Sequence, residues 1–283
     1  MANIRLIKGR IRSAKSIAQI TKAMELVAAS KMRKAQIQAL AGKLYAGKIY
    51  DMVQRLSRSS SSLLHPLFKI VDKPKGMRLV IVLSTNKGLC GGLNTNLFRF
   101  LLRSYENVTT HRYVTIGSKG AGALSQLGAT VIADFSVSTT GSVVPALTEL
   151  ITSQFLSGEI DGVDILYNEF VSALKQIPQK KSLLPLVLPH VKSGEDQKLD
   201  FLIEPSKEEV FNTLLPHYIE NQIRDTILQA NASEHSARMV AMRNATDNAL
   251  SFMEELTLLY NKARQEKITY EISDMVTARL AVE

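Results

Sequence analysis

Two glycine-rich turns are the stretches of this sequence whose residue types could bind a phosphate group. The first, Gly88-Leu-Cys-Gly-Gly-Leu-Asn, follows the apolar run 78–84 and precedes a predicted helix. A turn between a strand and a helix N-terminus presents backbone N–H groups that suit an anion. However, the spacing GxxxxGK[ST] is absent, and no Lys–Ser/Thr pair opens the helix. Close packing of the strand against the helix explains these glycines better than phosphate binding does.

The second turn, Gly117-Ser-Lys-Gly-Ala-Gly, also follows a predicted strand. It has some features of a dinucleotide-binding turn but lacks the order GxGxxG, and the next strand ends in Asp134, only 12 residues past Gly122. A nucleotide-binding α/β enzyme with a coiled-coil arm therefore stays as the alternative hypothesis. Tight ATP or NAD binding by the isolated protein would favour that alternative.

Other reactive residue types show no catalytic or metal-binding pattern. Nothing in the sequence places Cys90 beside His111, and a lone cysteine next to glycine is more often a small core residue. The five histidines lack metal-ligand spacing, and a single cysteine excludes a disulfide framework or a multi-cysteine metal site. No apolar run approaches the length of a membrane-spanning helix. We predict no catalytic residue, no metal site and no cofactor.

The net charge of +9 is concentrated near the N-terminus. Residues 1–58 contain 13 Lys or Arg against Glu25 and Asp51, a net of +11, whereas residues 217–283 contain 7 basic and 10 acidic side chains, a net of −3. The N-terminal segment therefore needs an anionic partner. A coiled-coil nucleic-acid binder is a third hypothesis, but the segment has no aromatic residue before Tyr45, and we predict no nucleic-acid partner.

The positions of apolar residues predict one long helix over residues 3–58. They follow alternating steps of three and four residues, a 3.5-residue period typical of a helix wound on another helix. This seam comprises Ile4, Ile7, Ile11, Ala14, Ala18, Thr21, Ala28, Met32, Ala35 and Ala39. A second apolar strip comprises Ile17, Ile20, Met24 and Val27. A helix with two apolar strips contacts more than one neighbour.

The C-terminal stretch His217–Glu283 holds 67 residues without proline or glycine. Apolar residues recur at helical spacing, so a single helix would be about 100 Å long, far more than the ~40 Å of a compact domain. Such a helix has to protrude or be enclosed by a partner. Two or three shorter helices stay as the alternative, because residues 231–248 have only moderate helix propensity.

Between the long helices, short β-branched runs alternate with helical segments, which predicts an α/β layer with a largely parallel sheet. The expected strands are 78–84, 113–117, 130–134 and 163–170, and the expected helices are 97–105 (with Asn94 as a possible cap), 123–127 and 145–158. Residues 171–205 read as an edge strand and a loop. We expect Ser206 to cap the last helix, with Glu209 completing a capping box. The predicted organisation is 1–58 N-terminal shaft helix, 59–76 linker, 77–205 α/β insert domain and 206–283 C-terminal shaft helix.

Four blocks of the sequence resemble the gamma subunit of bacterial F-type ATP synthase. They begin at Ile20 (ITKAMELVAASKMRKA), Gly88 (GLCGGLN), Ser233 (SEHSARMVAMRNATDN) and Tyr260 (YNKARQEKIT). The resemblance runs from about Ile4 to Val276. It implies an antiparallel coiled coil of the N- and C-terminal helices with a central Rossmann-like α/β insert domain.

The resemblance implies a non-catalytic central-stalk rotor. The shaft would turn inside a ring of three alpha and three beta subunits and would couple proton or sodium flow through the membrane c-ring to ATP synthesis or hydrolysis. The insert would stand beside the epsilon subunit and the c-ring, and the chain would be peripheral to the cytoplasmic face of the bacterial membrane.

The resemblance also implies beta-subunit contacts at particular positions. Met24 matches a position near the acidic lever of beta, with Lys31, Arg33 and Lys34 as partners for that acidic surface. Arg264 and Gln265 match the pair that hydrogen-bonds the beta catch loop, while Arg238, Thr269 and Asp274 match positions coupled to the region of Met24. The sequence departs from the family pattern at Tyr270, where glutamine is usual, and in the bulkier tail 277–283.

Overall fold

The computed structural model describes residues 4–57, 65–68, 76–136, 140–186, 204 and 206–280. The chain divides into two compact units: Met1–Ala29 with Arg238–Glu283, and Ser30–Ala237. The long helices α1 (Ile4–Ser57) and α5 (Lys207–Leu280) each contribute to both units. The predicted linker 59–76 lies mostly outside the described residues.

The unit 30–237 contains a five-stranded sheet in the order β3-β2-β1-β4-β5. Its strands are β1 (Arg78–Leu83), β2 (Arg112–Ile116), β3 (Thr130–Asp134), β4 (Gly162–Phe170) and β5 (Gln176–Leu184). Strands β1 to β4 pair in parallel, while the edge strand β5 pairs antiparallel with β4. The predicted α/β insert with a largely parallel sheet is confirmed.

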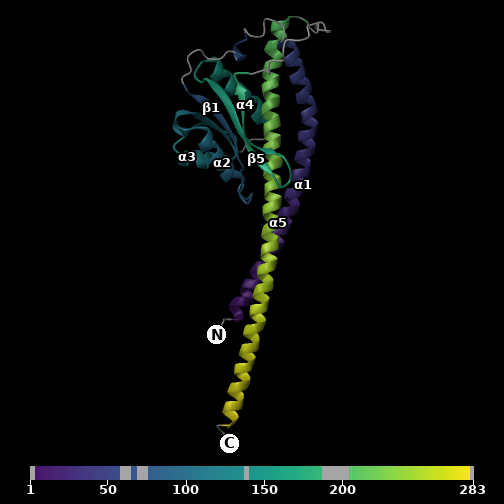
Figure 1. Ribbon diagram of the computed structural model, residues 1–283, viewed down its shortest axis with the longest axis vertical. Helices are drawn as coiled ribbons and strands as arrows, with labels where there is room; N and C mark the ends of the chain where they lie inside the picture. Colours follow the sequence, from purple (N-terminus) through teal and green to yellow (C-terminus); the bar gives the residue numbers. More distant parts are fainter. Residues whose placement is uncertain are drawn as a thin grey trace. The chain divides into compact units, whose positions relative to one another are not determined.

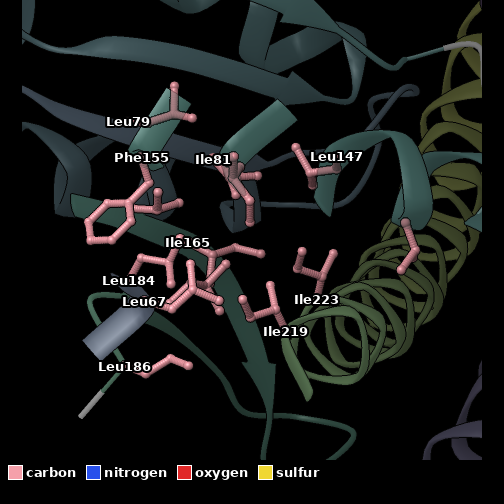
Figure 2. Close-up of a cluster of buried hydrophobic side chains, with 14 of the residues drawn as sticks. Leu67, Leu79, Ile81, Leu147, Phe155, Ile165, Leu184, Leu186, Ile219 and Ile223 are labelled. Atoms are coloured by element: carbon pink, nitrogen blue, oxygen red, sulfur yellow. The ribbon is translucent and has the colours of Figure 1, made fainter. Parts of the chain in front are cut away.

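Helices cover both faces of this sheet (Figure 1). On one face lie α2 (Leu93–Ser104) and α3 (Ser118–Gln126), around a small core that includes Val80 and Leu97. On the other face, α4 (Thr140–Leu156) and the first turns of α5 share the larger core. Figure 2 shows Ile81 of β1 and Ile165 of β4 in this core with Ile219 and Ile223 of α5. Residues buried on both faces explain why β1 is a continuous apolar run.

Helices α1 and α5 run antiparallel within each unit. In residues 1–29 and 238–283, Thr21 contacts Thr246, and the earlier residue Ile7 packs with the later residue Leu256. Within residues 30–237, Gly42 lies beside Leu228, while the later residue Tyr50 has its ring 6.3 Å from the ring of the earlier residue Tyr218. The predicted antiparallel pairing of the N- and C-terminal helices is confirmed.

The predicted seam of α1 is the buried one. Ile7, Ala14, Ala18, Thr21, Ala28 and Ala35 are all less than 10% exposed. The small residues of this seam allow the two helix backbones to approach closely. The predicted single helix over the C-terminal stretch is confirmed, and the alternative of two or three shorter helices is wrong, because α5 is one helix of 74 residues that begins before Pro216 and continues through it.

Three helix starts differ from the sequence-based expectation. Helix α4 begins at Thr140 rather than at Pro145, which lies inside the helix. Helix α2 begins at Leu93, with Gly92 rather than Asn94 at its N-cap, because the Asn94 side chain hydrogen-bonds Thr85 instead. Helix α3 begins at Ser118, so the expected turn 118–122 is helical. Ser206 accepts a hydrogen bond from the Glu209 amide at 3.2 Å, as a capping residue does. None of the helices within the described residues is long and apolar enough to cross a membrane.

Candidate partner-contact surfaces of the long helices

The unit formed by residues 1–29 and 238–283 is held together by a narrow apolar seam. Ile7, Leu256 and Ala263 are buried, with Ile4 and Tyr260 packed against them. In the same seam, Thr21 Oγ1 and Thr246 Oγ1 lie 2.7 Å apart. Each hydroxyl also lies within hydrogen-bond distance of a carbonyl one turn earlier on its own helix. Since each hydroxyl has one hydrogen, one of them donates to the other while that other donates to its own helix, and both donors are satisfied.

The second apolar strip of α1 is exposed to solvent. Ile17, Ile20, Met24 and Val27 have between 40% and 58% of their surface accessible. Their spacing places them on one face of the helix, beside the seam that packs on α5. An exposed apolar strip of this length is typical of a surface that binds another protein.

A groove of about 1100 Å³ lies between the start of α1 and the middle of α5. Its walls include Leu6 and Ile17 of α1 and Phe252 of α5, all at least half exposed. Two arginines, Arg5 and Arg10, also line it. The apolar periodicity of the sequence does not predict this groove. The sequence feature that could have indicated the groove is a set of small residues that line it: Gly9, Ser13, Ala14, Ala245 and Ala249.

The C-terminal end of α5 has no covering from the described part of the chain. Every residue from Arg264 to Arg279 is exposed. Ile268, Ile272 and Met275 nevertheless repeat at steps of four and three, which places three apolar side chains on one helix face. Tyr270, the residue that departs from the family pattern, is 55% exposed.

The residues predicted to contact a beta subunit lie in different parts of the chain. Lys31, Arg33 and Lys34 are exposed on α1 in the unit 30–237. The other six belong to the second unit: Met24, Arg238, Arg264, Gln265, Thr269 and Asp274.

Two features of this second group stand out. Arg238 is half-buried, whereas Thr269 is exposed and donates its hydroxyl to the Gln265 carbonyl at 3.0 Å. Thr21 contacts Thr246, and the two helices run antiparallel. Met24 therefore lies beside residues of α5 that come well before Thr269 and Asp274 in the sequence. The structure thus does not bring Met24 together with Thr269 and Asp274.

The carboxyl ends of β1 and β4 form the crevice where a sheet of this topology would bind a nucleotide, because the strand order reverses there. Here α5 covers that crevice with Ile227, Ala230, Asn231 and Glu234. The remaining cavity is about 30 Å³, whereas pockets for small molecules measure roughly 300 Å³ or more. The geometry of this crevice argues against nucleotide binding.

The second glycine-rich turn, at Gly117, serves strand–helix packing. A Cβ atom at Gly117 would lie 2.2 Å from the Ser84 carbonyl oxygen, and Gly117 has a φ of +111°. Cys90 is 3% exposed, and its sulfur lies 3.7 Å from Asn94 Nδ2 and 3.9 Å from Thr85 Oγ1. His111 instead contacts the Arg78 amide, so the cysteine and the histidine have different surroundings.

The strongest electrostatic cluster lies at the start of β1 and β4. Asp164 is fully buried and accepts two hydrogen bonds from the Arg78 guanidinium, at 2.6 and 2.7 Å, and one from the Tyr105 hydroxyl, at 2.6 Å. Lys180 Nζ lies 3.4 Å from the same carboxylate. Burial alone would raise the pKa of Asp164, but these partners hold it below its ordinary value. The cluster neutralises a buried charge and has the character of a structural network.

Comparison with known proteins decides the family. The family model described as ATP synthase matches residues 3–282. The chain is 42% identical to an ATP synthase gamma chain of Dehalococcoides mccartyi and 41% identical to one of Methylacidiphilum infernorum, and each match covers both chains completely. The chain belongs to the ATP synthase gamma-chain family. The resemblance seen in four sequence blocks is thereby confirmed over the whole length.

Solved structures agree with this family assignment. A chain of the Tetrahymena thermophila mitochondrial ATP synthase central stalk and c-ring is 25% identical, with a TM-score of 0.58, and the match covers 80% of this chain and 99% of that one. A chain from a Euglena gracilis mitochondrial ATP synthase structure shares the fold at 20% identity, with a TM-score of 0.69 over 99% of this chain and 94% of that one. A gamma chain is part of a membrane-associated enzyme complex, which accounts for helix surfaces left uncovered in the chain alone.

Proposed function

We propose that this gamma chain is the rotating central stalk of an ATP synthase and performs no chemistry itself. The observation that carries the proposal is the fully exposed segment 264–279 of α5, in a chain that matches the gamma family from end to end. A helix end with unpartnered apolar residues needs a surrounding partner. A ring of three alpha and three beta subunits would supply one.

In this proposal, each beta subunit meets a different side of the shaft as it turns. Two exposed strips of the shaft are apolar, and the side chains beside them include basic ones. The strips are Ile17, Ile20, Met24 and Val27 on α1, and Ile268, Ile272 and Met275 on α5. The binding free energy between a beta subunit and the shaft therefore depends on which side of the shaft faces that subunit. Three catalytic sites would then cycle through different affinities, which is coupling by differential contact.

The contacts we propose for the beta subunits are those that the resemblance implies. Lys31, Arg33 and Lys34 are exposed cations suited to an acidic surface, and Met24 lies on the exposed apolar strip of α1. Arg264 and Gln265 would donate hydrogen bonds to the catch loop. Arg238, Thr269 and Asp274 would be coupled to the region of Met24.

The α/β insert domain, residues 77–205, would engage the epsilon subunit and the c-ring, and the c-ring would carry proton or sodium flow. The chain would then sit at the cytoplasmic face of a bacterial membrane, held there by the complex.

Single-molecule rotation tests the proposal. The chain is combined with alpha and beta subunits, the α₃β₃ ring is fixed to a surface, and a bead is attached to the α/β domain. We expect ATP-driven rotation in the assembled complex and no ATP hydrolysis by the isolated chain. Hydrolysis by an α₃β₃ ring that is unaltered on adding this chain, with no rotation, would overturn the proposal.

A further inference from the structure

Three polar side chains of α5 fasten this helix to the β4–β5 hairpin. Ser233 Oγ donates to the Asn168 carbonyl at 2.8 Å, and Ser236 Oγ donates to the Ala173 carbonyl at 2.7 Å. Gln229 Oε1 accepts a hydrogen bond from the Phe170 amide at 3.4 Å. Positions 229, 233 and 236 are spaced by four and three residues, so they share one face of the helix.

This face differs in chemistry from the preceding turns of α5. There the buried positions are Ile219, Ile223 and Ile227, which pack into the large core. Ser233 and Ser236 are also fully buried, but their short side chains let the hairpin backbone come close enough for direct hydrogen bonds. Along α5, the contacts with the α/β domain therefore change from apolar packing to hydrogen bonds. This change occurs one to two turns before residue 238, where the helix enters the second unit.

The hairpin to which α5 is fastened is itself well braced. Strands β4 and β5 pair over most of their length, from Phe170 with Gln176 to Val163 with Leu184. At its tip, Gln176 Nε2 donates to the Ser172 and Ala173 carbonyls and to Ser236 Oγ. In the described part of the chain, four hydrogen bonds thus join the side chains of this α5 face to the hairpin.

Apolar contacts and hydrogen bonds resist different motions. Apolar burial opposes separation of two surfaces, but it is non-directional and permits small rotations. A hydrogen bond weakens steeply when its distance or angle departs from the optimum. Hydrogen bonds to the hairpin therefore fix the angle of α5 about its own axis, which the isoleucine contacts alone would fix less firmly.

We propose that Gln229, Ser233 and Ser236 form an angular clamp through which torque passes between the α/β domain and the α5 shaft. This inference rests on the proposed rotor function. The three are positioning residues: they would set the torsional stiffness of the chain and would leave ATP chemistry in the beta subunits unchanged.

The test measures angular fluctuation in the assembled α₃β₃ complex. Cys90 is buried, so a new cysteine at the exposed position Arg103 (Arg103→Cys) can carry the bead on the α/β domain. The double variant Ser233→Ala with Ser236→Ala removes three of the four hydrogen bonds. We expect the angular variance during pauses to rise roughly two-fold while the ATP hydrolysis rate changes little. The melting temperature should fall, because the buried Asn168 carbonyl loses its hydroxyl donor.

Thr213→Ala is the matched control, because Thr213 is exposed on the same helix and its hydroxyl bonds only one turn back, to the Glu209 carbonyl. Its angular variance should equal that of the unsubstituted chain. If the double variant rotates but its angular variance during pauses is unchanged, the proposed clamp is wrong while the rotor function still stands. Should the double variant fail to assemble, each single variant is measured in the same way, and unchanged variance in both would overturn the proposal equally.

Discussion

Asp164 keeps a carboxylate in the interior of the α/β domain, between Arg78 on β1 and the Tyr105 hydroxyl after α2. Removing one member of a buried ion pair leaves the other charge uncompensated, at a cost of about 3 kcal/mol or more. We therefore expect Asp164→Asn to lower the free energy of unfolding by about 3 kcal/mol at pH 7. Urea denaturation measures the change. Glu159→Gln, which breaks the exposed pair with Arg112, should cost under about 1 kcal/mol.

The same carboxylate predicts a pH dependence. The pKa of Asp164 is held below its ordinary value in the folded chain, so its stabilisation is present above the unfolded-state pKa near 4 and is lost as the pH falls through the lowered folded-state pKa. The stability difference between the unsubstituted chain and Asp164→Asn should be constant above about pH 5 and should shrink below about pH 4. A difference that stays constant down to pH 3 would contradict the charged network.

Replacing Gly117 or Gly122 with alanine should change the stability of the chain in opposite directions. Gly117 combines a φ of +111° with no room for a Cβ atom beside the Ser84 carbonyl, so Gly117→Ala should cost about 3 kcal/mol or more. Gly122 is exposed in α3 with nothing within 4 Å of a Cβ, so Gly122→Ala should stabilise the chain by up to about 1 kcal/mol. Thermal unfolding of both variants is the measurement. Equal melting temperatures would contradict the packing role of Gly117.

At the scale of elements, the sequence predicts the long helices and the sheet well, because their signals are local and repeat many times. The seam of α1 follows directly from its 3.5-residue period. The start of α2 could not be predicted, since Asn94 is a good capping residue whose side chain is drawn to Thr85, nine positions earlier. The groove beside Phe252 was also missed, because it depends on which residues of two distant helices lie opposite each other.

The pairing of α1 with α5 includes one polar contact whose energy can be isolated. Thr21→Val and Thr246→Val each remove one hydroxyl but leave the other bonded to its own helix. We expect a double-mutant cycle to give a coupling energy of about 1 kcal/mol, because the 2.7 Å contact is buried. Hydrogen exchange of the α1 amides near residue 21 reports this locally. Additive effects of the two substitutions would show that the hydroxyls do not interact.

At the scale of the whole molecule, stability and function separate along α5. Its N-terminal turns are part of the large core, whereas Arg264 and Gln265 are exposed and belong to none of the buried clusters of the described residues. We therefore expect Arg264→Ala and Gln265→Ala to change the free energy of unfolding by less than about 0.5 kcal/mol. In the assembled synthase, the same substitutions should lower rotational torque and ATP synthesis, because under the proposed function they remove donors to the catch loop.

Arg99→Ala is the control for this separation, since Arg99 is an equally exposed arginine on α2 of the α/β domain. It should leave torque and synthesis unchanged. Coupling is measured as ATP synthesis driven by an ion gradient in membrane vesicles, alongside torque from bead rotation. If Arg264→Ala and Gln265→Ala both retain full coupling, the catch-loop contact lies elsewhere on the shaft. If they instead unfold the chain, the exposed end of α5 contributes to the fold itself, and its isolation from the core is incorrect.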